Sequence, residues 1–101
     1  MLFRSLAVEM LASALERAGA ADPLKVARAL EGLKFAGPTG EVWMRPDDHQ
    51  LIHPLYVAKF VRAGRPDTER DAENTGFGWT TEFRVEAKDT VMPTTCSMRR
   101  P

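Results

Sequence analysis

The chain has 101 residues, 44% of them hydrophobic, and its 14 basic and 14 acidic side chains leave a formal net charge of zero. This composition is typical of a folded protein, and this length accommodates one small domain or a part of a larger one. The charge balance gives no electrostatic reason to expect nucleic acid or an anionic membrane as a partner. No apolar run approaches the ~20 residues that cross a bilayer.

The first residues have two features of a signal peptide. "MLFRSLAVEMLASA" contains an early Arg4 and an Ala-Ser-Ala that is typical of a cleavage site. Glu9, however, interrupts the apolar segment that a signal peptide needs, and no cationic segment precedes it. We therefore interpret this stretch as a helix and expect no signal peptide in the chain.

Two amphipathic helices are predicted next to each other. Apolar side chains recur at helical spacing in the first one: Phe3, Leu6, Met10, Ala14 and Ala18, with Leu11 and Leu15 widening the stripe. Gly19 is suited to end it, because glycine adopts the left-handed conformation without a Cβ clash. Asp22 and Pro23 are typical of the N-cap and first position of the second helix, which Gly32 ends. Its expected buried side consists of Leu24, Ala27 and Leu30, with Val26 and Leu33 as further candidates. Together these elements predict an αα-hairpin.

After the second helix the pattern changes to that of strands. "GPTG" (37–40) favours a turn, since Pro38 presets φ and Gly40 is free to take a positive φ. We predict one strand in "EVWMR" (41–45) and another in "LIHPLYVAKFVRA" (51–63), joined by a turn over residues 46–50. Pro54 places the start of the second strand at a sheet edge or just outside the ladder.

Residues 65–101 are expected to form a loop-rich C-terminal tail, with one short possible strand over 79–85. Residues 1–64 are expected to hold the helix pair and the strands. Three aromatic side chains of the tail, Phe77, Trp79 and Phe83, require a surface to pack against. A two-stranded sheet is marginally stable by itself. The apolar faces of the predicted helices and strands therefore require more packing partners than this sequence contains.

The polar stretch "DDHQ" (47–50) contains the candidates for chemistry. His49 and His53 are four residues apart, but they straddle a turn and a strand with Pro54 following, which disfavours a metal site. We expect Asp47 and Asp48 to cap the turn through their side chains. None of the serines, nor Cys96, has the local sequence of a catalytic nucleophile, so we expect neither catalysis nor a cofactor. Cys96 is either a free thiol or half of a disulfide whose partner lies outside this chain.

The order of several segments resembles a known family. "EMLASALERAGA", "ALEGLKFAGPTGEV", "DDHQLIHPLYV", "ENTGFGWTTE" and the ending "PTTCSMRRP" are similar to the C-terminal part of periplasmic substrate-binding proteins of branched-chain amino acid ABC transporters. These are Leu/Ile/Val-type proteins with the type I periplasmic-binding-protein fold. The resemblance extends from about residue 6 to residue 101.

The resemblance implies an α/β chain that is a fragment of a two-lobed protein, with an αα-hairpin followed by two or three strands and the tail. It implies a non-enzymatic role in binding an amino acid or amide ligand, with a membrane permease as partner and a periplasmic location for the intact parent. It also places Asp48, His49 and Gln50 next to the hinge between the lobes. A fragment with one helix pair and one crossing is not expected to bind ligand alone. The alternative is a small stand-alone interaction module without a ligand site.

Overall fold

The computed structural model describes residues 2–66, 68 and 71–100, without the side chains of residues 2–4. In chain order its elements are α1 (Leu2–Ala18), α2 (Pro23–Leu30), β1 (Lys34–Gly37), β2 (Gly40–Met44), β3 (Leu51–Ile52), β4 (Leu55–Arg62), β5 (Phe77–Val85) and the short 3-10 helix η1 (Ala87–Thr90). The α/β class and the αα-hairpin are confirmed.

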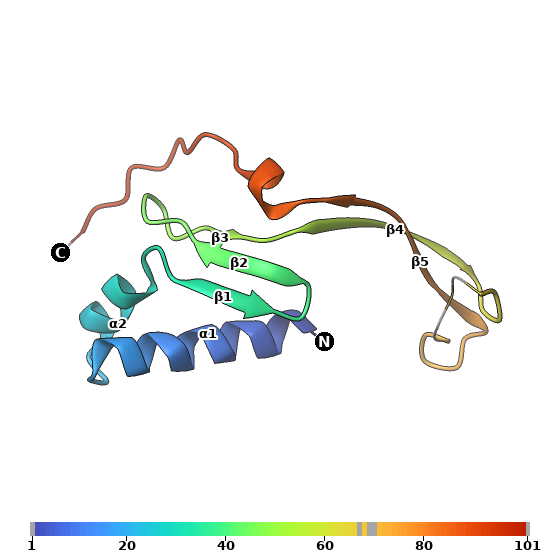
Figure 1. The fold of residues 1–101 in the computed structure, drawn as a ribbon, viewed down its shortest axis with the longest axis horizontal. Helices are drawn as coiled ribbons and strands as arrows, with labels where there is room; N and C mark the ends of the chain where they lie inside the picture. Colours follow the sequence, from blue (N-terminus) through green and yellow to red (C-terminus); the bar gives the residue numbers. More distant parts are fainter. Residues whose placement is uncertain (1, 67, 69–70, 101) are drawn as a thin grey trace.

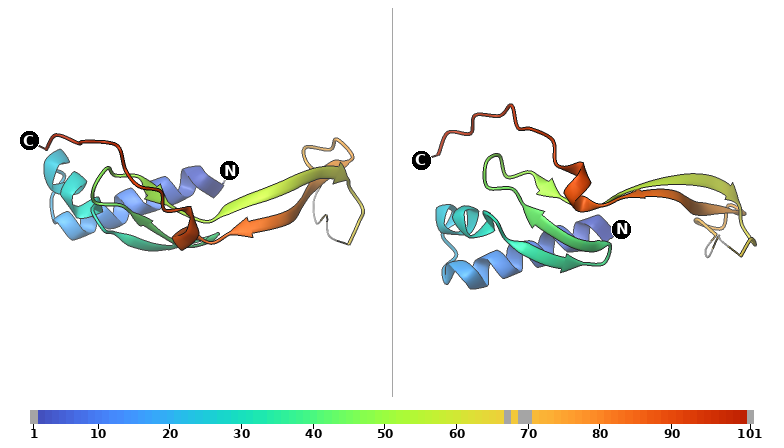
Figure 2. Two further views of the ribbon diagram at one scale, coloured as in Figure 1. Left: turned by 90° about the horizontal axis from the view of Figure 1, so that it is seen from above. Right: turned by 45° about the horizontal axis from the view of Figure 1, so that its top comes forward.

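The elements form two parts, which we name the body and the arm. The body contains α1, α2 and the antiparallel sheet β1-β2-β3, and the arm is the antiparallel hairpin of β4 and β5. Figure 1 shows the arm extending away from the body, and both views of Figure 2 agree. The radius of gyration is 17.2 Å, whereas a compact domain of this length has about 13 Å. The chain is therefore not a closed globule.

The helical hairpin is built as its sequence predicts. Gly19 takes φ +65°, and its N–H donates to the carbonyl of Leu15 at 3.0 Å. The Asp22 side chain accepts from the N–H of Lys25 at 2.9 Å and caps α2, with Pro23 in the first turn. These caps satisfy backbone groups that a helix end leaves without partners.

The core lies between α1 and one face of the body sheet. Leu6 and Met10 of α1 are each 3% exposed, and Val42 of β2 is fully buried against them. Partly buried apolar side chains complete the cluster: Leu33, Phe35, Met44 and Leu51. Helix and sheet approach closely at Gly37, where an added Cβ would lie 3.0 Å from Leu6 Cδ1.

The predicted apolar stripes are wider than the surface that covers them. Ala14 is buried, but Leu11 and Leu15 are 47% and 38% exposed, because only one side of α1 faces the narrow sheet. On α2 the prediction for Leu24 was wrong, since Val26 is the buried residue and Leu24 is 49% exposed. The expected burial of Phe3 lies outside the described side chains.

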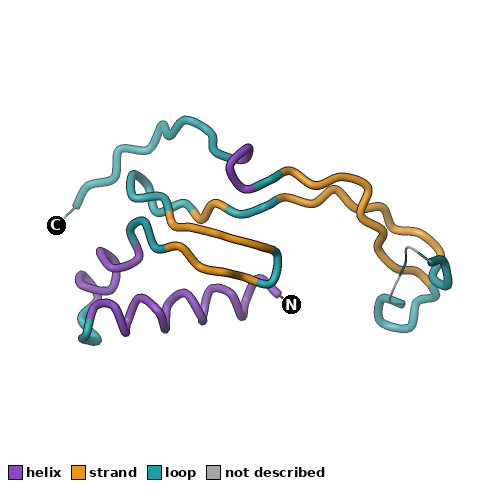
Figure 3. Tube along the Cα trace, in the orientation of Figure 1, coloured by secondary structure: helices purple, strands orange, loops and turns teal. Residues whose placement is uncertain are grey.

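The strands differ from the prediction in number and length. Among the described residues there are five rather than two or three. Figure 3 shows the strands in orange. The predicted strand over 51–63 is split at His53 and Pro54 into β3 and β4, because proline has no N–H for the ladder. The tail contains β5, which begins at Phe77 and pairs with the whole of β4 from Leu55↔Val85 to Arg62↔Phe77. The sequence of the short β1 has no clear alternation of apolar and polar residues, so this strand was not predicted.

The root of the arm is fixed to the β1–β2 turn. The carbonyl of Thr39 accepts from Tyr56 Oη at 3.2 Å and from Arg84 Nη2 at 3.4 Å. Tyr56 and Arg84 are also paired across the hairpin, with the guanidinium carbon 5.4 Å from the ring centroid. The arm is thus attached to the body at its base.

Candidate functional site

The "DDHQ" turn joins β2 to β3 and is held by Arg45. Arg45 Nε and Nη2 donate to the two carboxylate oxygens of Asp48 at 2.8 and 2.5 Å. Nη2 also donates to Gln50 Oε1 at 2.7 Å, and the Gln50 N–H donates to Asp48 Oδ1 at 3.1 Å. The expected side-chain cap of the turn is therefore confirmed for Asp48, with Arg45 as a partner that the sequence analysis did not single out.

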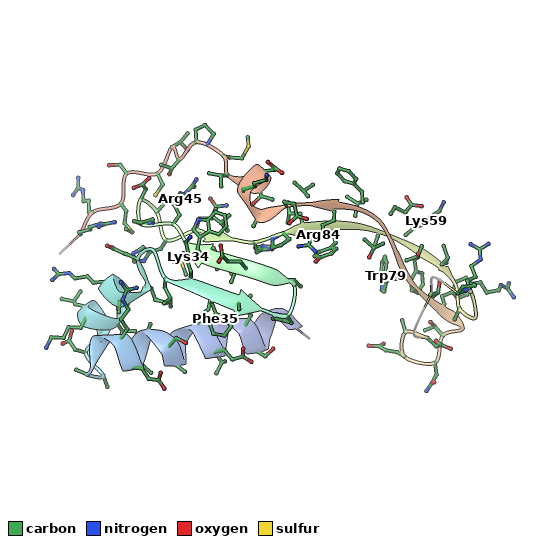
Figure 4. All side chains as sticks on the ribbon, viewed as in Figure 1. Lys34, Phe35, Arg45, Lys59, Trp79 and Arg84 are labelled. Atoms are coloured by element: carbon green, nitrogen blue, oxygen red, sulfur yellow. The ribbon has the colours of Figure 1, made fainter. Side chains whose placement is uncertain are left out.

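This ion pair has electrostatic and structural consequences. The Arg45 and Asp48 side chains are only 11% and 10% exposed, so water screens their attraction less than it does at an open surface. The Arg45 hydrogen bonds hold the pKa of Asp48 well below its usual range, and the Thr94 hydroxyl adds to this effect. Arg45 Nη1 also donates to the carbonyl of Met92, which ties the tail to the turn. Figure 4 shows Arg45 at the end of the body away from the labelled Trp79 and Lys59 of the arm.

His49 connects the same turn to the end of α2. It takes φ +55°, a conformation that is uncommon for a residue other than glycine. Its Nε2 lies 3.1 Å from Oε1 of Glu31, the C-cap residue of α2. Arg100 Nη1 lies 3.0 Å from the same oxygen, and Arg100 Nη2 donates to the carbonyl of Pro46. The hydrogen bond from His49, with the nearby charge of Arg100, lowers the pKa of Glu31.

These contacts gather three segments that are distant in the sequence. The C-terminal end of α2, the turn and residues 92–100 meet through Glu31, Arg45 and Arg100. Sequence reasoning did not select these three residues. The three-residue spacing of Arg45 and Asp48 was a usable signal, whereas Glu31 and Arg100 are 69 positions apart in the sequence and gave none.

The hinge-adjacent candidates Asp48, His49 and Gln50 occupy one end of the body. The chain passes from the body to the arm elsewhere, at His53 and Pro54. Figure 1 shows the turn and the arm at opposite ends of the body sheet. The hinge role of the three residues therefore stays a prediction.

The two histidines have separate surroundings. His53 Nδ1 lies 2.8 Å from the carbonyl of Pro54, whereas His49 faces Glu31. In residues 2–66, 68 and 71–100 no group of three His, Cys, Asp or Glu side chains is arranged to hold a metal ion. Cys96 is exposed and is a free thiol in this chain. No helix within the described part of the chain is long and apolar enough to cross a membrane.

The arm differs from the polar end in having two apolar faces. Large side chains on both of its strands are more than a third exposed: Leu55, Tyr56, Val57, Phe60, Phe77, Trp79 and Phe83. Phe60 contacts Phe77 and Trp79 at centroid distances of 5.6 and 4.8 Å. Even so, Trp79 is 62% exposed and Phe83 is 61% exposed. Such a surface is unusual for a protein that works alone, since contiguous apolar patches mark interaction sites.

Comparison with known proteins identifies similar chains. A family model described as periplasmic binding protein matches residues 3–65. The chain is similar to the leucine-, isoleucine-, valine-, threonine- and alanine-binding protein from Brucella ovis in its closed conformation, with a TM-score of 0.78 and 24% identity. That match covers 95% of this chain and 25% of the Brucella chain. No curated protein matches the chain.

Two structures from Rhodopseudomonas palustris are also similar. One is an ABC-type branched-chain amino acid transporter from strain CGA009, with a TM-score of 0.60, 21% identity and coverage of 83% of this chain and 20% of that one. The other is a solute binding protein of an ABC transporter from strain BisB5, in complex with 3,4-dihydroxybenzoic acid. Its TM-score is 0.61 at 20% identity, covering 82% of this chain and 21% of that one. The chain thus spans about a quarter of the length of the Brucella protein and about a fifth of the other two.

Proposed function

Since the chain belongs to the periplasmic binding protein family and has a part of its type I fold, we propose that it is the C-terminal part of a solute-binding component of an ABC import system. The proposed role is non-enzymatic. The proposed ligand of the intact parent is an amino acid or a similar small molecule, and its partner is a membrane permease. The family implies a periplasmic location for that parent.

The observation that carries this proposal is the uncovered arm. A two-stranded ribbon with apolar side chains on both faces is at best marginally stable in water without a packing surface. The similar structures are four to five times longer than the segment they share with this chain. The remainder of such a protein is the surface that we propose covers Trp79 and Phe83.

It follows that the ligand site of the parent needs residues from outside this chain. A two-lobed binding protein surrounds its ligand with polar groups from both lobes and closes over it. We propose that residues 1–64 supply the helix pair and strands of one lobe with its crossover, and that residues 65–101 form the C-terminal tail. In this proposal Asp48, His49 and Gln50 fix the turn next to the hinge between the lobes and make no contact with ligand.

Cys96 is proposed to form a disulfide with a cysteine outside this chain. The exposure of Cys96 supports this proposal, since the thiol lies at the surface of a segment that Arg45 and Arg100 hold against the body. The intact parent, kept under non-reducing conditions, should then leave Cys96 unlabelled by a thiol reagent. Rapid labelling of the native parent would contradict the disulfide.

Calorimetric titration tests whether the ligand site is incomplete in this chain. Leucine, isoleucine and valine added to the isolated chain should give no binding heat. A micromolar dissociation constant would contradict the proposal that the site is incomplete.

Reconstitution tests the role of the arm. The chain should co-elute in gel filtration with a Brucella ovis protein from which the corresponding quarter has been deleted. Trp79→Asp should abolish co-elution, because it would bury a charge in the contact. The exposed Lys34→Asp variant on the body serves as the matched control and should still co-elute.

The stand-alone interaction module is the second candidate, and the same exposed arm favours it. The DNA upstream of Met1 discriminates between the two. An in-frame continuation that encodes the other lobe supports the binding component. A natural start site without such a continuation supports the module.

A further inference from the structure

A pocket at the polar end of the body has no part in the proposed function. Its walls come from α2, the turn over residues 46–50 and the last residues of the tail. Its volume is about 420 Å³, which falls in the usual range of roughly 300–1,000 Å³ for small-molecule sites. All of the residues that line it belong to this chain.

Two of the walls are apolar. Leu24 and Ala27 of α2 form one of them, because residues spaced by three positions share one face of a helix. Leu24 is 49% exposed, since the body core receives Val26 instead. Met98 of the tail forms an apolar wall of the same pocket. The part of the α2 stripe that the core leaves uncovered thus lines a cavity.

The charged lining is predominantly positive. Arg28, Arg99 and Arg100 line the pocket along with a single carboxylate, Glu31. Glu31 is already paired with Arg100 at 3.0 Å and with His49 at 3.1 Å. Arg99 makes no hydrogen bond or ion pair within the described residues. Its guanidinium therefore remains available to an anion that enters.

We propose that this pocket binds a small organic carboxylate that has an apolar body and no ammonium group, and that Arg99 donates to the carboxylate. The arginine-rich lining repels an ammonium group, so leucine, isoleucine and valine are not expected to bind here. A guanidinium presents a planar pair of donors that matches the two oxygens of a carboxylate. The apolar body of the ligand would lie against Leu24 and Met98, which removes their surface from water. The negative charge of the ligand offsets the excess of arginine in the lining.

Titration of the full 101-residue chain with phenylacetate, followed by amide NMR, tests the proposal. We expect saturable shifts at the amides of Ala27 and Met98. Phenylacetamide has the same shape without the charge and should bind at least tenfold more weakly. Arg99→Gln should weaken phenylacetate binding about tenfold. Arg62→Gln, on the arm, should leave the binding unchanged.

Three results would overturn the proposal. The first is an absence of saturable shifts at the pocket, the second is equal affinity for the acid and its amide, and the third is unchanged affinity in Arg99→Gln. Amide spectra of the variants that superpose outside the pocket show that each substitution has left the body folded. Arg99 is an exposed side chain near the chain end, so its substitution removes no core contact.

Discussion

Arg45 and Asp48 form a two-pronged ion pair that closes the turn between β2 and β3, with donor–acceptor distances of 2.8 and 2.5 Å. The same arginine holds the carbonyl of Met92 through Nη1. A single guanidinium therefore connects a turn to a tail segment more than forty residues away. Removal of Asp48 would leave this partly buried cation without its main partner.

This pair predicts a pH dependence of stability. The pKa of Asp48 is lower in the folded chain than in the unfolded chain, where it is about 4. Its contribution is therefore complete above about pH 4 and is lost as the pH falls through the lowered folded pKa. We expect Asp48→Asn to be less stable than the parent at pH 7, and the difference to shrink below about pH 4. Urea unfolding, followed by circular dichroism at pH values between 2 and 7, measures the stability of both proteins as a function of pH.

Asp47→Asn is the matched control for this experiment. Asp47 makes no hydrogen bond within the described residues and acts on Arg45 only through its charge, more weakly than Asp48 does, so its variant should depart from the pH dependence of the parent less than Asp48→Asn does. If the curves of Asp48→Asn and the parent stay parallel over the whole pH range, the ion pair does not stabilise the fold.

The core between α1 and the sheet predicts a contrast between two neighbouring residues. Met10 is 3% exposed and Leu11 is 47% exposed. Met10→Ala should lower the free energy of unfolding by about 3 kcal/mol, because it opens a cavity beside Val42. Leu11→Ala should cost about 1 kcal/mol or less, since much of its surface is already in water. Chemical denaturation of both variants checks the contrast, and equal losses would mean that α1 packs through a different face.

The N-cap of α2 gives a prediction that is independent of the core. Asp22→Ala removes the acceptor for the Lys25 N–H and should destabilise the chain by about 1 kcal/mol. Asp22→Asn keeps an acceptor oxygen and should retain most of the stability. The urea midpoints of the two variants provide the comparison. A loss as large in Asp22→Asn as in Asp22→Ala would argue against the hydrogen bond.

The arm predicts a fluorescence signal. The chain has two tryptophans, so Trp43→Phe leaves Trp79 as the only one. Because Trp79 is 62% exposed, its emission in the monomer should resemble that of tryptophan in water and should shift to shorter wavelength when a partner covers the arm. A short-wavelength emission that persists on dilution of a monomeric sample would show that the arm folds back on the body.

The local features of this chain followed from its sequence. Gly19, Asp22 and Pro23 define helix ends through backbone preferences that act over a few residues. The turn around Asp48 was likewise predictable from its composition. The family resemblance is confirmed by the match over residues 3–65.

The polar end of the body was not predictable in the same way. Glu31 meets Arg100, and Arg45 meets Met92, only because the tail runs back across the turn toward α2, as Figure 1 shows. The β4–β5 pairing also joins residues 55–62 to a segment that looked like a loop. Such contacts depend on the path of the whole chain, which local propensity does not specify.

The sequence by itself determined the two helices, their caps, the turn at "DDHQ" and the family, because each depends on short-range preferences or on the order of residues along the chain. Only the tertiary structure decided which apolar side chains are covered. Leu6, Met10 and Val42 face one another across the body, whereas Leu24 lines a pocket and Trp79 lies on an open ribbon. The reason is geometric. An amphipathic pattern predicts that the apolar face of a helix or strand requires a packing surface. Only the folded chain shows whether that surface is present.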